Sequence, residues 1–400
     1  MKKSKKLLAL LLSLAMIVGL AACTSTNPSG GNTETQSGNS ASPSGNTETQ
    51  SGGTVTDSAG SILNEDGTFE IAMITDKGDI NDKSFNQGTW EGILDYCQTN
   101  GKTCKYYKPV DATTDDYVAA MEQAIKDGAK VVVTPGFLFE EPVYIVQENH
   151  PDVKFILIDG NPHNADYSDY KTTDNTVGIL FSEEQVGYLA GYAAVKDGYT
   201  KLGFFGGQPV PAVIRYGYGY VQGANDAAKE LGITVDMRYF NTDSFDATPE
   251  AQTRAASWYT AGTEIIFGCG GSVGNSVMAA AEQNNGLVIG VDVDQSTESD
   301  TVVSSAMKGL SAAVEQMLDS YYNDNFSVGG QNLTLGAADD AVKLPMDTSK
   351  WQNFTQEDYD ALYAKLASGE ITLQKDTDAN GNPIASPVDL GCTNVNVTVE

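Results

Sequence analysis

Short apolar runs alternate with helical segments from about residue 68 onward, and this alternation limits the fold more than any other feature. The apolar runs that predict strands are residues 70–75, 105–107, 131–133, 155–158, 202–205, 234–239, 264–267 and 287–291. The segments that predict helices are residues 84–100, 115–126, 140–149, 183–196, 214–231, 249–261 and 272–284. Strands and helices that alternate at this spacing form parallel sheets with right-handed crossovers. Two such series predict an α/β protein with two doubly wound lobes.

The first predicted helix begins with a local capping signal. Ser84 and Gln87 form the S-x-x-Q pattern of a capping box, in which the serine hydroxyl binds a backbone N–H of the first turn. Trp90, Ile93 and Cys97 then recur at helical spacing and predict a buried face. We therefore expect the Ser84 side chain to cap this helix.

Polar residues and glycines follow shortly after several predicted strands. They are Asp76, Gly136, Asp159, Gln208, Gly270 and Asp292. In open α/β sheets, ligands bind outside the carboxyl ends of the strands. We therefore expect the carboxyl edges of the two lobes to face each other across a ligand cleft, as in a bilobed solute-binding protein.

The composition disfavours several classes of protein. Among 400 residues there are 24 Lys+Arg against 53 Asp+Glu, a formal net charge of −29, so a basic nucleic-acid surface is not expected. Two histidines, His150 and His163, and five cysteines disfavour a zinc site built on such ligands. A Ser-His-Asp enzyme would have to use one of those two histidines. We expect no cofactor, no metal and no nucleic-acid partner.

The N-terminus has the pattern of an export signal. Four lysines among residues 2–6 precede an apolar run over residues 7–20, which predicts a signal peptide over residues 1–22. The small residues Ala21 and Ala22 before Cys23 resemble a bacterial lipobox, in which the cysteine carries the lipid. This predicts a lipid anchor on Cys23 at the extracytoplasmic face of the cell membrane. The alternative is an ordinary signal peptide with an incidental cysteine.

Residues 23–67 form a predicted linker. They are rich in Ser, Gly and Thr, and the octet at residues 31–38 recurs unchanged at residues 45–52. Such a composition cannot bury enough apolar area to offset chain entropy, so we expect a flexible tether.

A set of motifs points to a known family. They are ITDKGDINDKSFNQ at residues 74–87, PGFLF at 135–139, FSEE at 181–184, YLAG at 188–191, GG at 206–207, GVDVDQ at 290–295 and SSAMK at 304–308. Together they resemble the basic membrane protein family, whose members are substrate-binding lipoproteins of ABC importers and include the purine nucleoside receptor A type. The resemblance implies the type I periplasmic-binding fold, with two lobes joined by a hinge.

The lobe boundaries follow from this resemblance. The N-terminal lobe is predicted to contain residues 68–178 and about 296–324. The C-terminal lobe is predicted to contain residues 179–295 and about 325–375, and residues 376–400 form a predicted C-terminal tail.

The resemblance also implies a nucleoside pocket. Asp76 and Asp159 match family carboxylates of that pocket, and Phe85 matches an aromatic residue that stacks on the base. Ser84 stands where family members often have asparagine. Tyr216 matches the opposite stacking aromatic, which is usually phenylalanine.

The sugar end of the pocket is implied in the same way. Gly271 matches a glycine-rich loop that approaches the ligand, and Asp292 and Lys308 match the pair that holds the ribose hydroxyls. A carboxylate accepts hydrogen bonds only, so it suits two hydroxyl donors. The acidic composition favours a neutral nucleoside over a phosphorylated one.

Other motifs are incomplete. Residues 268–274 have Val273 where the dinucleotide motif G-x-G-x-x-G requires glycine, and a calcium-like loop from residue 376 has Pro387 at its last ligand position. Cys97 and Cys104 flank a predicted Asn-Gly turn, and a disulfide between them is left open because it depends on the turn geometry.

Three functions therefore remain after the sequence is read. The first is a monomeric, non-enzymatic lipoprotein that captures nucleosides, purine nucleosides foremost, and delivers them to the permease subunits of an ABC importer. The second is the same fold with a sugar or an autoinducer as its ligand. The third is a secreted nucleoside-processing enzyme, for which the acidic residues are spread over both lobes without a metal-binding cluster.

Overall fold

The computed structural model describes residues 54–57, 60–378 and 380–400. The predicted signal peptide, Cys23 and most of the linker lie outside the described residues. In the described part of the chain, none of the helices is both long enough and apolar enough to cross a membrane.

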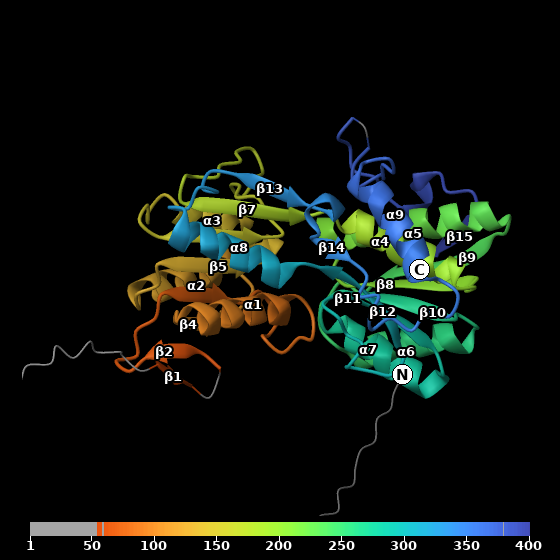
Figure 1. Ribbon diagram of the computed structural model, residues 1–400, viewed down its shortest axis with the longest axis horizontal. Coiled ribbons are helices and arrows are strands. Elements are labelled where there is room, and N and C mark those ends of the chain that lie inside the picture. Colours follow the sequence, from red (N-terminus) through yellow and green to blue (C-terminus); the bar gives the residue numbers. More distant parts are fainter. Residues whose placement is uncertain (1–53, 58–59, 379) are drawn as a thin grey trace, which may run out of the picture. The chain divides into compact units, whose positions relative to one another are not determined.

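The first lobe is built on a mixed sheet whose described strands run in the order β1-β2-β4-β3-β5-β6-β7-β13. The strands are β1 (Thr54–Thr56), β2 (Ile62–Asn64), β3 (Ile71–Ile74), β4 (Cys104–Tyr107), β5 (Val131–Pro135), β6 (Lys154–Ile158), β7 (Thr176–Phe181) and β13 (Asn332–Leu335). Strands β4, β3, β5, β6, β7 and β13 are parallel, and the hairpin β1–β2 adds an antiparallel edge. In Figure 1 strands β1 to β7 run from red-orange to yellow-green, and β13 is blue.

Helices cover both faces of the first sheet. They are α1 (Phe85–Asn100), α2 (Thr114–Lys126), the 3₁₀ helix η1 (Phe137–Phe139), α3 (Glu140–Val146) and α8 (Leu310–Asn323). Apolar residues alternate along each strand: Ile71 and Met73 share a core with α1 and α8, whereas Ala72 and Ile74 share a core with α2 and α3. This two-sided burial explains why the strands read as short, continuous apolar runs.

The second lobe has a sheet in the order β14-β12-β11-β10-β8-β9-β15, as far as the chain is described. The strands are β8 (Lys201–Gly206), β9 (Val235–Asn241), β10 (Ile265–Cys269), β11 (Leu287–Asp292), β12 (Val302–Lys308), β14 (Val342–Lys343) and β15 (Val395–Val399). The helices are α4 (Glu183–Lys196), α5 (Pro211–Leu231), α6 (Pro249–Thr260), α7 (Val273–Asn284), η2 (Ala337–Asp339), α9 (Gln356–Ala367) and η3 (Pro387–Leu390). Helices α6 and α7 pack on one face of this sheet and α4 and α5 on the other.

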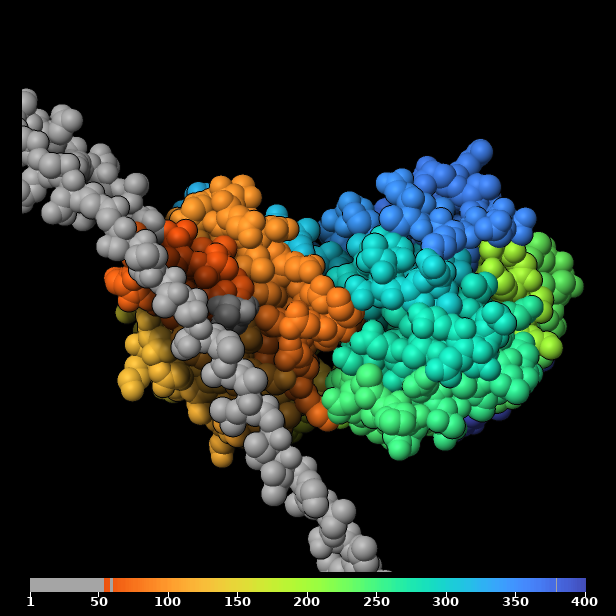
Figure 2. Space-filling model, turned by 90° about the horizontal axis from the view of Figure 1, so that it is seen from below, coloured from red at the N-terminus to blue at the C-terminus, as the bar shows by residue number. Residues whose placement is uncertain are grey.

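The chain passes between the sheets three times within the described residues. It leaves the first sheet after β7, returns to it after β12, and leaves it again between β13 and β14. In Figure 1 the teal helix α8 and strand β13 accordingly lie among the orange and yellow elements of the first lobe. Figure 2 shows the seam between the first lobe, mainly in orange, and the second lobe, mainly in green and teal.

Four predicted boundaries differ from this path. The linker was predicted to extend to residue 67, but β1 and β2 form a hairpin at the edge of the first sheet. The first lobe was predicted to end at residue 178, but β7 continues to Phe181. Residues from about 296 were assigned to the first lobe, but β12 pairs with β11 in the second sheet, and the crossing comes after Lys308. Residues from about 325 were assigned to the second lobe, but β13 pairs with β7 in the first sheet. Local periodicity predicts no strand in these segments, and the sheet that a strand joins depends on pairing with strands far away in the sequence.

The C-terminal segment is part of the second lobe and not a separate tail. Strand β15 pairs in parallel with β9 and forms the edge of the sheet. The side chain of Glu400 accepts hydrogen bonds from Arg238, Arg254 and the indole N–H of Trp258. These contacts attach the segment to the sheet edge and to α6.

Cys97 and Cys104 are free, buried thiols in this structure. Cys97 lies in the last turn of α1 and Cys104 begins β4, and Gly101 between them has the left-handed conformation that ends the helix. The disulfide that the sequence left open is therefore not formed here.

Candidate functional site

The carboxyl ends of strands from both sheets meet around one cavity. Its volume is about 290 Å³, and residues from both lobes line it. Asp76, Gly136 and Asp159 follow β3, β5 and β6 of the first sheet. Gly271 follows β10 and Asp292 ends β11 in the second sheet. The predicted cleft between two lobes is confirmed, and its size is near the lower end of the range for ligand pockets.

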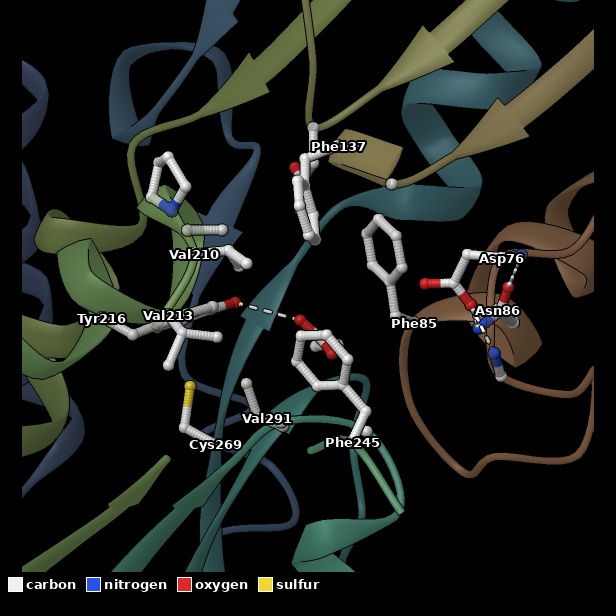
Figure 3. Close-up of a pocket in the computed structure, with 18 of the residues that line it drawn as sticks. Asp76, Phe85, Asn86, Phe137, Val210, Val213, Tyr216, Phe245, Cys269 and Val291 are labelled. Carbon is white, nitrogen blue, oxygen red and sulfur yellow. Dashed lines mark hydrogen bonds between the residues drawn. The ribbon is translucent and has the colours of Figure 1, made fainter. Parts of the chain in front are cut away.

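Three phenylalanine rings line the cavity from different elements. Phe85 is the first residue of α1, Phe137 begins η1, and Phe245 lies in the loop between β9 and α6. Figure 3 shows the three rings around a common space, with Phe137 above, Phe85 at the side and Phe245 below. Such rings offer flat faces on which a planar ligand can stack.

A buried ammonium group lies at the centre of the site. The side chain of Lys308 is 2% exposed, and its Nζ donates hydrogen bonds to Asp159 and, at 3.4 Å, to Glu183. The Oδ1 atom of Asp292 is 3.8 Å from the same nitrogen. Burial alone would lower the pKa of Lys308, but the three carboxylates outweigh burial and raise it. Lys308 is therefore charged, and it links the carboxyl ends of the two sheets.

The same ammonium group lies over an aromatic ring. Lys308 Nζ is 4.6 Å from the centre of the Phe85 ring, within the range of a cation–π contact. The two residues come from different lobes, so the ring that could stack on a ligand is next to the buried charge.

Asp159 retains an acceptor for a ligand. Its Oδ2 accepts the hydrogen bond from Lys308, whereas its buried Oδ1 has no hydrogen-bond partner among the described residues. Burial raises the pKa of Asp159 to about 6, although Lys308 acts in the opposite direction. A hydroxyl or N–H of a bound molecule would satisfy this oxygen.

Glu183 extends the charge network away from the cavity. It is fully buried at the start of α4, and its Oε2 accepts a hydrogen bond of 2.6 Å from Arg215 Nε. Burial works to raise the pKa of Glu183, but Arg215 and Lys308 outweigh it and lower the pKa. Arg215 also reaches Asp376 at 3.4 Å, so the C-terminal segment contributes to the cavity wall.

Asp76 lies at the other end of the cavity. Its Oδ1 accepts hydrogen bonds from the backbone N–H of Gly78 at 2.7 Å and from the Asn86 side chain at 2.8 Å. Burial raises the pKa of Asp76 to about 6. Figure 3 shows Asp76 and Asn86 together beyond Phe85, on the side away from Tyr216. The two aspartates that the resemblance placed together, Asp76 and Asp159, therefore have different neighbours.

Ser84 does not cap α1. Its hydroxyl donates to Asp292 Oδ2, across the seam between the lobes, and makes no capping hydrogen bond. Asp82 takes the capping role, because its carboxylate accepts hydrogen bonds from the backbone N–H groups of Ser84, Asn86 and Gln87. The capping-box prediction was wrong, because the carboxylate of Asp82 binds the backbone N–H groups that the Ser84 hydroxyl was expected to bind.

Tyr216 lines the cavity without offering a free ring face. It is 2% exposed, and its ring packs edge-on against Phe267 at a centroid distance of 5.8 Å and an interplanar angle of 88°. Its hydroxyl is 3.4 Å from Asp292 Oδ1 and 3.3 Å from the carbonyl oxygen of Ala306. Figure 3 shows the hydroxyl pointing toward the cavity with the ring behind it.

The glycine loop after β10 comes close to the loop after β8. A Cβ atom on Gly270 would lie 2.6 Å from the backbone nitrogen of Gly207, and Gly270 has φ +152°. Gly271 also has a positive φ, +54°, and lines the cavity as predicted by its position. The loop can therefore approach a ligand with its backbone.

The structure thus brings most of the predicted residues together. The ones that line the cavity are Asp76, Phe85, Asp159, Tyr216, Gly271, Asp292 and Lys308. Ser84 contacts the site through Asp292. The sequence analysis did not identify Asn86, Phe137, Glu183, Arg215 and Phe245 as site residues. The first three lie inside the quoted motifs, Arg215 directly precedes Tyr216, and Phe245 carries no signal. Within the described ranges, no group of histidine, cysteine and acidic side chains is arranged to hold a metal ion.

Known proteins resemble this chain in sequence. The family model of ABC transporter substrate-binding proteins of the PnrA-like type matches residues 69–377. The ABC transporter nucleoside-binding protein BmpA from Lactococcus lactis subsp. cremoris (strain MG1363) is 29% identical over 330 residues, which cover 76% of this chain and 88% of that protein. Basic membrane protein B from Borreliella afzelii (strain PKo) is 30% identical over 284 residues, which cover 69% and 80%.

Solved structures show the same fold. A solute-binding protein of an ABC transporter system from Aeropyrum pernix K1 aligns with a TM-score of 0.67 at 22% identity, over 78% of this chain and 95% of the other. A second such protein, from Conexibacter woesei DSM 14684, aligns with a TM-score of 0.62 at 22% identity, over 77% and 99%. With the family model spanning most of the described residues, this chain belongs to the family of PnrA-like substrate-binding proteins of ABC transporters.

Proposed function

We propose that this chain captures a nucleoside, with purine nucleosides foremost, in the cavity between its lobes and delivers it unaltered to an ABC permease. The observation that carries this proposal is the combination of aromatic faces with buried carboxylate acceptors and the buried ammonium group of Lys308 in a single cavity. Phe85, Phe137 and Phe245 suit a flat base, and Asp292 and Lys308 suit the hydroxyls of a sugar.

The charge of the cavity favours a neutral ligand over an anionic one. Its lining includes the carboxylates of Asp76, Asp82, Glu140, Asp159, Asp246, Asp292 and Asp376, against the cations of Lys77, Arg215 and Lys308. A nucleotide phosphate would bring negative charge into this environment. The name of the Lactococcus relative supports the same ligand class.

Residues 1–22 and Cys23 supply the expected means of attachment. In this proposal the signal peptide directs export, and a lipid on Cys23 holds the protein at the extracytoplasmic face of the cell membrane. The linker that follows lets the two lobes reach the permease.

Calorimetry tests the ligand. The full-length chain, purified in detergent, is titrated with adenosine, guanosine, inosine, cytidine and uridine, and with glucose, galactose and ribose as sugar controls. We expect saturable heat with at least one nucleoside and none with the sugars. Chromatography of the recovered ligand should return it unchanged. A response to sugars alone would favour the sugar-binding alternative, and conversion of the nucleoside to its base would favour an enzyme.

A further inference from the structure

Helix α5 carries three buried tyrosines whose hydroxyls have different partners. The hydroxyl of Tyr216 reaches Asp292 inside the cavity. Tyr218 donates to the carbonyl oxygen of Ile384 at 2.8 Å, in the C-terminal segment. The buried hydroxyl of Tyr220 has no hydrogen-bond partner among the described residues. Of the three hydroxyls, that of Tyr216 alone is directed at the site.

The backbone around Tyr216 is held firmly. A Cβ atom on Gly187 of α4 would lie 2.2 Å from the carbonyl oxygen of Tyr216, and one on Gly219 of α5 would lie 2.1 Å from that of Glu184. The two helices therefore touch backbone to backbone. Because the ring also packs edge-on against Phe267, the tyrosine hydroxyl has little freedom to move.

Each oxygen of the Asp292 carboxylate has one hydroxyl donor. Ser84 donates to Oδ2. The Tyr216 hydroxyl lies 3.4 Å from Oδ1 and 3.3 Å from the carbonyl oxygen of Ala306, so its one proton is shared between these two acceptors. Lys308 is 3.8 Å from Oδ1 but makes closer contacts with Asp159 and Glu183. Removal of the Tyr216 hydroxyl would therefore take away one of the contacts that fix the orientation of the Asp292 carboxylate. Each carboxylate oxygen can accept more than one hydrogen bond, so both retain capacity for a ligand.

We propose that the Tyr216 hydroxyl contributes to the specificity of the cavity by holding the Asp292 carboxylate aimed at the hydroxyl groups of the ligand. Tyr216 is then a positioning residue and not a stacking residue. This inference rests on the proposed function, since it concerns how the same site distinguishes ribonucleosides from nucleosides that lack the sugar hydroxyls.

Tyr216→Phe tests the inference, because it removes one oxygen atom and keeps the ring. Binding of adenosine, guanosine and inosine, and of their 2′,3′-dideoxy analogues, is measured by calorimetry on the full-length chain. We expect affinity for the ribonucleosides to fall about three- to tenfold, which is the usual effect of losing one hydrogen bond. Affinity for the dideoxy analogues should change less than about twofold, because they have no diol for Asp292 to accept.

Tyr220→Phe is the matched control. It removes a hydroxyl from the same helix and a similar depth, next to the same Phe267 ring, but this hydroxyl has no partner among the described residues. Both ligand classes should bind this variant within about twofold of the wild type. Ser84→Ala is a second test variant, because it removes the donor from the other oxygen of Asp292 and should change the same ratio in the same direction.

The pH dependence of binding gives an independent readout. Burial already raises the pKa of Asp292. We expect the loss of a hydroxyl donor to the ionised carboxylate to raise this pKa further. Ribonucleoside binding by Tyr216→Phe should therefore be lost at a higher pH than in the wild type as the pH falls. The charged and titratable groups around Asp292 are Lys308, Asp82, Glu183 and the thiol of Cys269, and they are the same in both proteins.

The outcomes separate this inference from the proposed function. If the wild type binds nucleosides and Tyr216→Phe weakens ribonucleosides and dideoxy analogues equally, Tyr216 has only a structural role and the inference is wrong. An unchanged affinity for both ligands, with an unchanged pH profile, also overturns it. If the wild type binds no nucleoside, the proposed function fails first and the inference falls with it.

Discussion

Asp159 and Asp292 occupy matching places in the two sheets of the protein. Asp159 follows β6 of the first sheet and Asp292 ends β11 of the second, and both have left-handed backbone conformations, with φ values of 60° and 66°. Both carboxylates contact Lys308 Nζ. Aspartate tolerates this conformation better than most residues. One ammonium group therefore holds together two strand ends that belong to different lobes.

Removing that ammonium group should destabilise the fold. Lys308→Met leaves Asp159, Glu183 and Asp292 buried without their shared cation, and breaking a buried charge network typically costs about 3–5 kcal/mol. Urea unfolding at pH 7 measures the loss. The difference in the free energy of unfolding between Lys308→Met and the wild type should become smaller toward pH 5, because protonation of the buried carboxyl groups removes their uncompensated charges.

Lys343→Met is the control for this prediction. Lys343 pairs with Asp340 on the surface, where an ion pair contributes about 0–1 kcal/mol. A loss for Lys308→Met no larger than that for Lys343→Met would contradict the assignment of Lys308 as the buried centre of the network.

Asp76 should make the stability depend on pH. Burial raises its pKa from 3.8 to about 6, so the folded state binds a proton more tightly than the unfolded state does. Its contribution is therefore favourable at low pH and is lost as the pH rises from about 4 through about 6. Urea unfolding between pH 4 and pH 7.5 should show a smaller decline over this window for Asp76→Asn than for the wild type. Parallel profiles for the two proteins would mean that Asp76 is ionised throughout.

The aromatic face of Phe85 should contribute to the affinity for any nucleoside. Phe85→Ala is expected to weaken binding by about 1–3 kcal/mol, roughly 5- to 150-fold, because one stacking surface disappears. Calorimetry should give the same factor for a ribonucleoside and for its 2′,3′-dideoxy analogue, since the change affects the base. A loss confined to the ribonucleoside would place Phe85 at the sugar.

Asp292→Ala should discriminate between the same two ligands. Ribonucleosides are expected to lose at least about 1–3 kcal/mol, because two hydroxyls lose their acceptor and Lys308 loses one of its carboxylates. The dideoxy analogue should be affected far less. An equal loss of affinity for both ligands would show that Asp292 has a structural role and does not bind the ribose.

The anchor prediction concerns the N-terminus. Cys23→Ser removes the only sulfhydryl of the lipobox-like run, so we expect the protein to appear in the medium or the periplasm and not in the membrane fraction. Fractionation and mass spectrometry of the N-terminal peptide measure both effects. A variant that stays in the membrane fraction would require another attachment.

The alternation of strands and helices could be predicted because each element has a local signal. Helix α4, for example, spans the residues expected for it, 183–196. Strand β7 was missed and β12 and β13 were assigned to no element, and the membership of β12 and β13 in a sheet depends on pairing with strands far away in the sequence. Local patterns do not contain that pairing.

The sequence likewise predicted part of the candidate site, namely the residues at the ends of strands, but not their long-range partners. Residues at the ends of strands were found because strand ends gather at one edge of a parallel sheet. The partner of the Ser84 hydroxyl, in contrast, is Asp292, which lies 208 residues away in the sequence. A local sequence pattern cannot indicate so distant a partner, so it favoured the capping box. The role of Tyr216 could not be separated from that of Tyr220, since both are spaced to face the core and differ in what the folded chain brings to their hydroxyls.

Neither lobe is a continuous piece of chain, and this has a consequence for biogenesis. The first sheet needs β13 and the second needs β15, and each pairs with a strand that lies far earlier in the sequence. During synthesis, or during the export proposed above, both sheets therefore keep an open edge until these later strands arrive. Unpaired strand edges invite association between chains. We therefore expect the two sheets to need protection from association until β13 and β15 have paired.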